Sequence, residues 1–206
     1  MKFKDFTEAF KDYPIITQAA IGMQPKPSYL RRLITDWLRK DWLISLKKGC
    51  YVINQTHYRE RLSALYIANQ IYQPSYISCQ SALSYYGMIP EAVFATTSIS
   101  TRKTTRFQNK LGNFIYFNLK VERFAGFSQR LVNGLPVLIA DREKALVDQV
   151  YLNLSDFDKA VDFAESWRLQ NLSPLRPALL RKHSRQFNNK KLSRLIDELS
   201  SIRMDY

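Results

Sequence analysis

The sequence predicts an α+β protein, in which a small N-terminal winged helix-turn-helix precedes a larger mixed α+β domain with a helical C-terminus. Two observations carry this prediction. The first 53 residues contain three helical patterns, then two strand patterns joined by a basic turn. The rest of the chain alternates helical and strand patterns and ends with four helical ones. Hydrophobic residues make up 46% of the 206 residues, which supplies a packed core and excludes a mainly disordered chain.

The first two helices are expected to be short. Apolar side chains recur at helical spacing near the start of the chain, at Phe3, Phe6, Ala9 and Phe10. Pro14 then interrupts the pattern, because proline lacks the backbone N–H that a helix interior requires. A second helix is predicted from Thr17, a suitable N-cap, to Gly22.

The third helix has the clearest pattern. Pro25 and Pro27 mark a loop, Ser28 offers an N-cap, and the helix is expected to end near Lys40. Its apolar stripe consists of Leu30, Leu33, Ile34, Trp37 and Leu38. One continuous stripe predicts a helix that buries a single face and leaves the others in solvent.

A β-hairpin is expected to complete the small domain. Residues 42–46 and 50–53 read as strands, and Lys47, Lys48 and Gly49 form the turn, with glycine where a positive φ is needed. We therefore predict a winged helix-turn-helix domain over residues 1–57 and an α+β domain over residues 58–206.

The larger domain is predicted to alternate helices and strands before it becomes helical. A helix over residues 58–72 is followed by an extended piece at 76–78, and Ser78 is expected to cap a helix that Gly87 ends. Strands are predicted at residues 94–100 and 114–117, with a hairpin over 127–139 around Asn133-Gly134. The final helices are predicted at residues 141–151, 155–167, 173–182 and 188–202.

Basic residues exceed acidic ones by a wide margin. Lys and Arg number 31 against 18 Asp and Glu, a formal net charge of +13, which attracts nucleic acid or an acidic surface. Residues 102–130 hold seven bases and one acid, and residues 168–194 hold eight bases and no acid. A solvated face is the alternative for either run. The predicted basic surface of the C-terminal domain comprises Arg102, Lys103, Arg106, Lys110, Arg181, Lys182, Arg185, Lys190 and Lys191.

The third helix and the hairpin turn are the predicted DNA contacts. A helix fits the major groove, where Arg can read guanine edges, while lysines beside it can meet phosphate. The predicted DNA-binding residues are Lys26, Ser28, Tyr29, Arg31, Arg32, Thr35, Lys47 and Lys48. A domain of this type that serves only protein contacts remains the alternative.

We expect no enzymatic activity, metal or cofactor. Asp141, Glu143 and Asp148 do not share one helical face, and acids near a helix start more often favour the helix dipole. His57 and His183 have no recognisable nucleophile partner, and no glycine-rich phosphate-binding motif occurs.

The remaining features concern the cysteines and the compartment. Cys50 and Cys79 lie in apolar surroundings without a CxxC motif and are predicted to be buried thiols. No apolar run reaches the roughly 18 residues that cross a bilayer, and the start of the chain lacks a signal-peptide pattern. We therefore expect a cytoplasmic protein with no membrane partner.

Three motifs in order carry a resemblance to a known family. They are KGCYVI at residues 48–53, YISCQSALSYYGMIPE at residues 76–91 and ADREKALVD at residues 140–148. Together they resemble the AbiEi antitoxin family of type IV toxin-antitoxin, phage-defence systems, over nearly the whole chain. Members usually have Pro or a similar residue where this chain has Arg142.

The resemblance implies a two-part antitoxin. Its N-terminal winged helix would repress its own operon by binding double-stranded operator DNA with inverted repeats. Its C-terminal domain would counteract a nucleotidyltransferase toxin without forming a stable complex, and its basic surface would touch operator DNA or compete for the toxin's nucleic-acid target. The alternative is a non-enzymatic interaction protein that binds a toxin or RNA directly.

Overall fold

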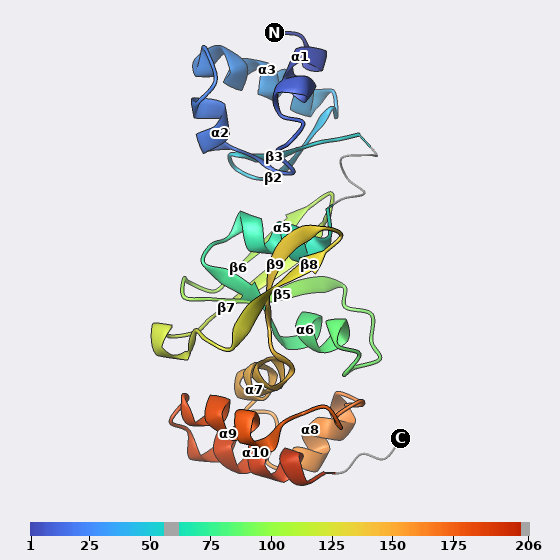
Figure 1. Cartoon of the computed structure of the whole chain (residues 1–206), viewed down its shortest axis with the longest axis vertical. Coiled ribbons are helices and arrows are strands. Elements are labelled where there is room, and N and C mark those ends of the chain that lie inside the picture. Colours follow the sequence, from blue (N-terminus) through green and yellow to red (C-terminus); the bar gives the residue numbers. More distant parts are fainter. Residues whose placement is uncertain (56–61, 203–206) are drawn as a thin grey trace.

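A computed structural model describes residues 1–55 and 62–202, and it is a mixed α+β structure with two sheets (Figure 1). The N-terminal part, residues 1–55, contains three helices and a small antiparallel sheet of strand order β1-β3-β2. Its elements are α1 (Phe3–Ala9), β1 (Ile16–Thr17), α2 (Gln18–Gly22), α3 (Pro27–Arg39), β2 (Leu43–Lys47) and β3 (Cys50–Ile53).

The starts of α2 and α3 show how local sequence sets these helices. The Thr17 side chain accepts the backbone N–H of Ala20 at 3.3 Å, so the predicted N-cap is confirmed. The expected cap at Ser28 is wrong. Lys26 is the N-cap of α3 in a left-handed conformation, and Pro27 is the first helical residue, a position where the missing N–H costs nothing.

Aromatic packing holds the N-terminal helices together. Phe6 and Phe10 of the first helical segment are fully buried, and the Phe6 ring lies 4.7 Å from that of Trp37 on α3. Leu30 and Ile34 are buried on the same face of α3. The predicted apolar stripe therefore faces the N-terminal core, and the remaining faces of α3 are left exposed.

The larger part, residues 62–202, is built around a six-stranded sheet of order β6-β7-β5-β4-β9-β8. Strands β4 and β9 pair in parallel, as do β5 and β7, and the other neighbours are antiparallel. The elements before the last helices are α5 (Ala64–Ile71), β4 (Ser75–Ile77), α6 (Cys79–Tyr85), β5 (Ala95–Ser100), β6 (Thr105–Asn109), β7 (Gly112–Asn118), η1 (Val121–Arg123), β8 (Phe127–Val132) and β9 (Leu135–Ala140).

Four helices follow the sheet and lie at the end of the molecule opposite the N-terminal part (Figure 1). They are α7 (Arg142–Leu152), α8 (Ala160–Ser166), α9 (Pro177–Arg185) and α10 (Lys190–Ser201). Buried side chains of α7, including Leu146 and Val150, belong to the same apolar core as Ile77 and Ile139 of the sheet. No helix in the described ranges combines the length and the apolar character that crossing a bilayer requires.

Some predicted elements differ from the observed ones. Strand β6 was not expected, and α8 begins at Ala160 instead of near residue 155, because Glu198 of α10 accepts the backbone N–H of Ala160. The helix expected over 58–72 begins at Ala64, and its expected first turn falls partly outside the described residues. The hairpin at Asn133-Gly134 is confirmed, with φ of 52° and 77° at the two turn residues.

The small sheet lies between the N-terminal helices and the large sheet (Figure 1). Alternate side chains of β3 enter different cores: Ile53 packs with the N-terminal helices, whereas Cys50 and Val52 pack with the core of the larger part. The Asn109 amide, at the end of β6, also donates to the Leu46 carbonyl of β2 at 3.1 Å. The two parts therefore share a continuous apolar contact.

Candidate nucleic-acid interface

The exposed face of α3 carries six of the predicted DNA-binding residues. Because Leu30, Ile34 and Trp37 turn inward, the polar side chains on the other faces of α3 face solvent. The residues that lie exposed there are Lys26, Ser28, Tyr29, Arg31, Arg32 and Thr35. The apolar stripe of α3 packs in the N-terminal core, so the predicted DNA-binding residues of this helix lie together on its solvent-facing surface.

Three of these side chains are cations that form no ion pair with any residue the structure describes. Arg39 at the end of α3 lies 3.5 Å from Asp36, but within the described ranges Lys26, Arg31 and Arg32 have no carboxylate within 4 Å. The cations are therefore free to meet an external anion. A helix with two adjacent free arginines on its exposed face suits groove binding, since Arg can bind phosphate or a guanine edge bidentately.

The hairpin turn is held more firmly than a freely projecting wing. Lys48 is exposed and Lys47 is half-buried. Gly49 has φ of +82° and lies against Gln18, the first residue of α2, so closely that a Cβ there would come within 2.5 Å of it. The turn is thus fixed beside α2, and Lys48 is the side chain of the two that is open to phosphate.

The predicted C-terminal basic residues form two separate surfaces. One is the β5–β6 loop and β6, next to the N-terminal part, and the other is α9 and α10 at the opposite end of the molecule (Figure 1). Arg102, Lys103, Arg106, Lys110, Arg181, Lys182, Arg185 and Lys190 are exposed, and Lys191 is half-buried.

Several of these cations already have acidic partners. Arg181 lies 2.8 Å from Asp197, and Lys191 lies 2.7 Å from Asp158. Lys110, just after β6, forms a 2.7 Å ion pair with Asp41, which follows α3. That pair joins the N-terminal part to the larger part. Lys110 therefore contributes to the contact between them, a role its position in a basic run does not reveal.

Asp148 of α7 lies in a fully buried polar cluster. Its carboxylate accepts from Lys144 at 2.6 Å, from the Ser78 hydroxyl at 2.8 Å and from the Tyr76 hydroxyl at 3.0 Å. Burial raises the pKa of Asp148, while Lys144 and the two hydroxyls act against that rise. The expectation that the acids of this segment serve the helix start is wrong for Asp148. Ser78 occupies the N-cap position of α6, but its hydroxyl serves Asp148 instead.

Glu143, in the first turn of α7, forms a second polar contact. It is almost fully buried and accepts two hydrogen bonds at 3.0 Å from Arg176, one from the backbone and one from the side chain. Burial acts to raise the pKa of Glu143, but the hydrogen bonds from Arg176 outweigh it and the pKa is lowered. Glu143 therefore anchors the start of α9 to α7.

His183 of α9 is also buried, and its Nδ1 has no hydrogen-bond partner within residues 1–55 and 62–202. Burial lowers the pKa of His183, and nearby Lys144 lowers it further. The other histidine, His57, lies outside the described residues. Cys50 and Cys79 are free and buried, as predicted, and burial raises the pKa of both thiols.

Sequence reasoning missed a hollow of about 270 Å³ at the start of α7. It is lined by Arg130, Arg142 and Arg176, with Asp141 and Glu143 beside them. These arginines lie in different elements, so no local motif brings them together. In the described part of the chain, no three His, Cys, Asp or Glu side chains gather as metal ligands would.

Comparison with known proteins adds no family assignment. No protein-family model matches the chain, and no curated protein matches it either.

Proposed function

We propose that the protein is an antitoxin of a type IV toxin-antitoxin, phage-defence system, and that it represses its own operon by binding operator DNA. The observation that carries the DNA-binding part is the exposed face of α3, on which Lys26, Arg31 and Arg32 have no acidic partner in the described ranges. The motifs at residues 48–53, 76–91 and 140–148, which resemble those of AbiEi antitoxins, carry the rest.

The arrangement of the N-terminal part supports a winged helix-turn-helix. Three helices precede a β2–β3 hairpin, and β1 adds a third strand beside β3. In this fold class the helix that enters the major groove projects from the domain, with a hairpin near the backbone. Here α3 takes the first role and Lys48 of the hairpin turn takes the second.

The division of labour follows from chemistry. Arg31 and Arg32 would read base edges, because a guanidinium can donate two parallel hydrogen bonds to guanine. Lys48 would meet phosphate, which fixes register without carrying sequence information. Inverted repeats in the operator would then each present one half-site to one copy of the protein.

Neutralisation is assigned to the larger part, residues 58–206. The support is the position of two of the three motifs: residues 76–91 span β4's end and α6, and residues 140–148 span the start of α7. Both meet at the Asp148 cluster. This part would counteract a nucleotidyltransferase toxin without a stable complex, using its exposed basic residues on nucleic acid.

A second candidate is an interaction protein that uses the N-terminal part for protein contact and binds a toxin or RNA directly. It is favoured by two exposed apolar side chains next to the cations: Met23 is 80% exposed and Tyr29 is 49% exposed. Tyr and Met are enriched at protein–protein interfaces relative to the rest of the protein surface.

One experiment in two arms tests the proposal. The full chain is tested for binding to the promoter region upstream of its own gene, and for rescue of cells that express the adjacent nucleotidyltransferase from an unrelated promoter. We expect protection of an inverted repeat and rescue of growth. Failure to bind that DNA above an unrelated duplex would refute repression, and failure to rescue would refute neutralisation. Stable co-purification with the toxin would favour the second candidate.

A further inference from the structure

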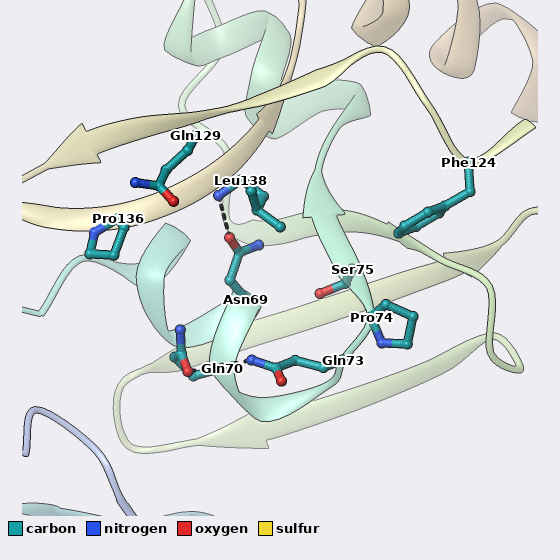
Figure 2. Close-up of a pocket in the computed structure, with 9 residues that line it drawn as sticks. All are labelled: Asn69, Gln70, Gln73, Pro74, Ser75, Phe124, Gln129, Pro136 and Leu138. Carbon is teal, nitrogen blue, oxygen red and sulfur yellow. Dashed lines mark hydrogen bonds between the residues drawn. The ribbon is translucent and has the colours of Figure 1, made fainter.

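The large sheet contains a pocket that the proposed function does not use. It has a volume of about 600 Å³, within the range of small-molecule sites, and lies between the end of α5, the start of β4 and strands β8 and β9 (Figure 2). No lining side chain carries a charge. The part of a ligand that enters it must therefore be neutral.

Two residues in the wall of this pocket each carry a buried polar atom that has no hydrogen-bond partner in the described part of the chain. Asn69 is 5% exposed and Ser75 is 3% exposed, and the two atoms are Asn69 Nδ2 and Ser75 Oγ. The orientation of the Asn69 amide is fixed, because its oxygen accepts the backbone N–H of Leu138. Its NH₂ group is therefore directed toward Ser75 (Figure 2). Leaving such groups unpaired costs stability, so a pair of them marks a place where a ligand can supply the missing acceptor.

The remaining lining suits a flat ring. Phe124 reaches into the pocket from one side, and Leu138 forms part of its apolar wall (Figure 2). Three further amide side chains surround the space, those of Gln70, Gln73 and Gln129. Aromatic and apolar contact on ring faces combined with amide and hydroxyl groups at the ring edge is the chemistry by which proteins hold nucleobases.

A cation lies next to this site. Arg102 Nη1 donates to the Gln73 carbonyl at 3.2 Å, and its guanidinium lies over the Tyr72 ring. Arg102 is exposed, so it remains available to a phosphate that is attached to a bound base. A neutral pocket beside an exposed arginine matches a nucleotide, whose base is neutral and whose phosphate is charged.

From these contacts we propose that the pocket binds a nucleobase that bears a ring carbonyl, such as uracil or guanine, on a nucleotide or at an unpaired position of a nucleic-acid strand. The carbonyl oxygen accepts from Asn69 Nδ2 and from the Ser75 hydroxyl. Adenine is disfavoured, because it has no carbonyl and the Asn69 oxygen that would face its amino group already accepts from Leu138. The site does not depend on DNA binding by α3, so either can fail without the other.

The test uses the full chain and calorimetric titration with guanosine, uridine and adenosine, their 5′-triphosphates, and single-stranded hexamers of uridine and of adenosine. We expect guanosine and uridine to bind more tightly than adenosine, and the triphosphates more tightly than the nucleosides. Binding of the uridine hexamer alone would assign the base to a strand. No binding of any of these probes would overturn the proposal.

Two variants address the contacts directly. Ser75→Ala removes one hydroxyl, and Asn69→Asp keeps the acceptor for Leu138 while it removes the donor. Each should weaken uridine and guanosine binding about three- to tenfold, the value of one hydrogen bond. Asn69→Asp, measured at pH 8, should also reduce the preference over adenosine, which a purely structural role would not do.

A matched control is available on the neighbouring strand β5. Ser98 is fully buried and its hydroxyl, like that of Ser75, has no partner among the residues that the structure describes, but Ser98 does not line the pocket. Ser98→Ala should leave the affinity unchanged. Equal affinities of the wild type, Ser75→Ala and Asn69→Asp would overturn the proposed site even if a nucleoside binds elsewhere on the protein.

Discussion

Two arginines of α3 differ in their surroundings from two basic side chains of α9 and α10. On α3, Arg31 and Arg32 face solvent with no carboxylate within 4 Å among the described residues. At the other end of the molecule, Arg181 is paired with Asp197 and Lys191 with Asp158. The net charge of +13 counts all of these cations alike. The difference teaches that a charge run locates basic residues, while only their partners decide which are available to nucleic acid.

Reversing the free cations should have the largest effect. Arg31→Glu with Arg32→Glu should abolish specific operator binding, because each lost bidentate base contact costs about 1–3 kcal/mol and the new carboxylates repel phosphate. Stability should be unchanged, since both side chains are exposed. Gel-shift titration measures the affinity, and thermal unfolding checks the fold.

The control for that variant carries the same change in charge at the opposite end. Lys182→Glu with Arg185→Glu alters α9, where both side chains are exposed and, like Arg31 and Arg32, have no ion-pair partner among the described residues, so the control changes only the position of the reversed charges. It should weaken operator binding far less. If the two double variants lose affinity equally, the comparison between the ends fails and α9 is part of the DNA interface.

The Lys144–Asp148 ion pair is the opposite case to Arg31 and Arg32, because both of its side chains are fully buried. Lys144→Met should lower the free energy of unfolding by about 3–5 kcal/mol, because it leaves the buried Asp148 carboxylate without its counter-ion. Chemical denaturation measures the loss. Arg181→Met, at an ion pair whose side chains are about half exposed, should cost less than about 1 kcal/mol. A Lys144→Met protein as stable as the wild type would show that the Lys144–Asp148 pair does not stabilise the fold.

The buried cation also predicts how stability depends on pH. Burial and Lys144 lower the pKa of His183 in the folded protein, so the unfolded state takes up a proton more readily. The stability that the neutral His183 contributes to the folded protein is therefore present above its unfolded pKa of about 6.5. It is lost as the pH falls below that value. Denaturation midpoints from pH 7.5 to 5.5 should fall for this reason.

The histidine variants isolate that contribution. His57→Gln leaves His183 as the one imidazole side chain in the sequence and should keep the pH dependence. His183→Gln should flatten it. An unchanged slope in His183→Gln would assign the pH dependence to other groups.

The smallest expected effect concerns the hairpin turn. Lys47→Ala with Lys48→Ala should weaken binding to all DNA sequences alike and lower the slope of log affinity against log salt by about 0.9 for each lost phosphate contact. Because Lys47 is half-buried, we expect the loss of one contact rather than two. A change in the preferred base pairs, measured by competition with altered operators, would make the turn a base reader.

Local signals predicted much of the fold. The Thr17 cap, the stripe on α3 and the Asn133-Gly134 turn depend on neighbouring residues, and all three are confirmed. Strand β6 escaped prediction because it is an edge strand of mostly polar residues, in which Phe107 is the one large apolar side chain. One face of β6 is exposed and the other is only half-buried, so the apolar alternation by which a strand is predicted is weak here.

The features that could not be predicted from the sequence depend on contacts between residues far apart in the chain. The start of α8 is fixed by Glu198, 38 positions away in the sequence from Ala160. For the candidate site, the exposed face of α3 followed from periodicity, but the partners of Lys110 and Lys191 did not. The pocket at Asn69 was invisible in the sequence for the same reason: its lining comes from segments that meet only after the sheet has formed.

The alternation along β3 links the thermodynamics of the two parts. Cys50 and Val52 belong to the core of the larger part, and Ile53 belongs to the N-terminal core. Neither core can lose this strand alone, because its backbone is common to both. Melting of the chain should therefore be a single cooperative transition, in which the enthalpy from calorimetry equals that from the van't Hoff analysis. A DNA duplex bound at α3 would accordingly raise the melting temperature of the α7–α10 helices as well.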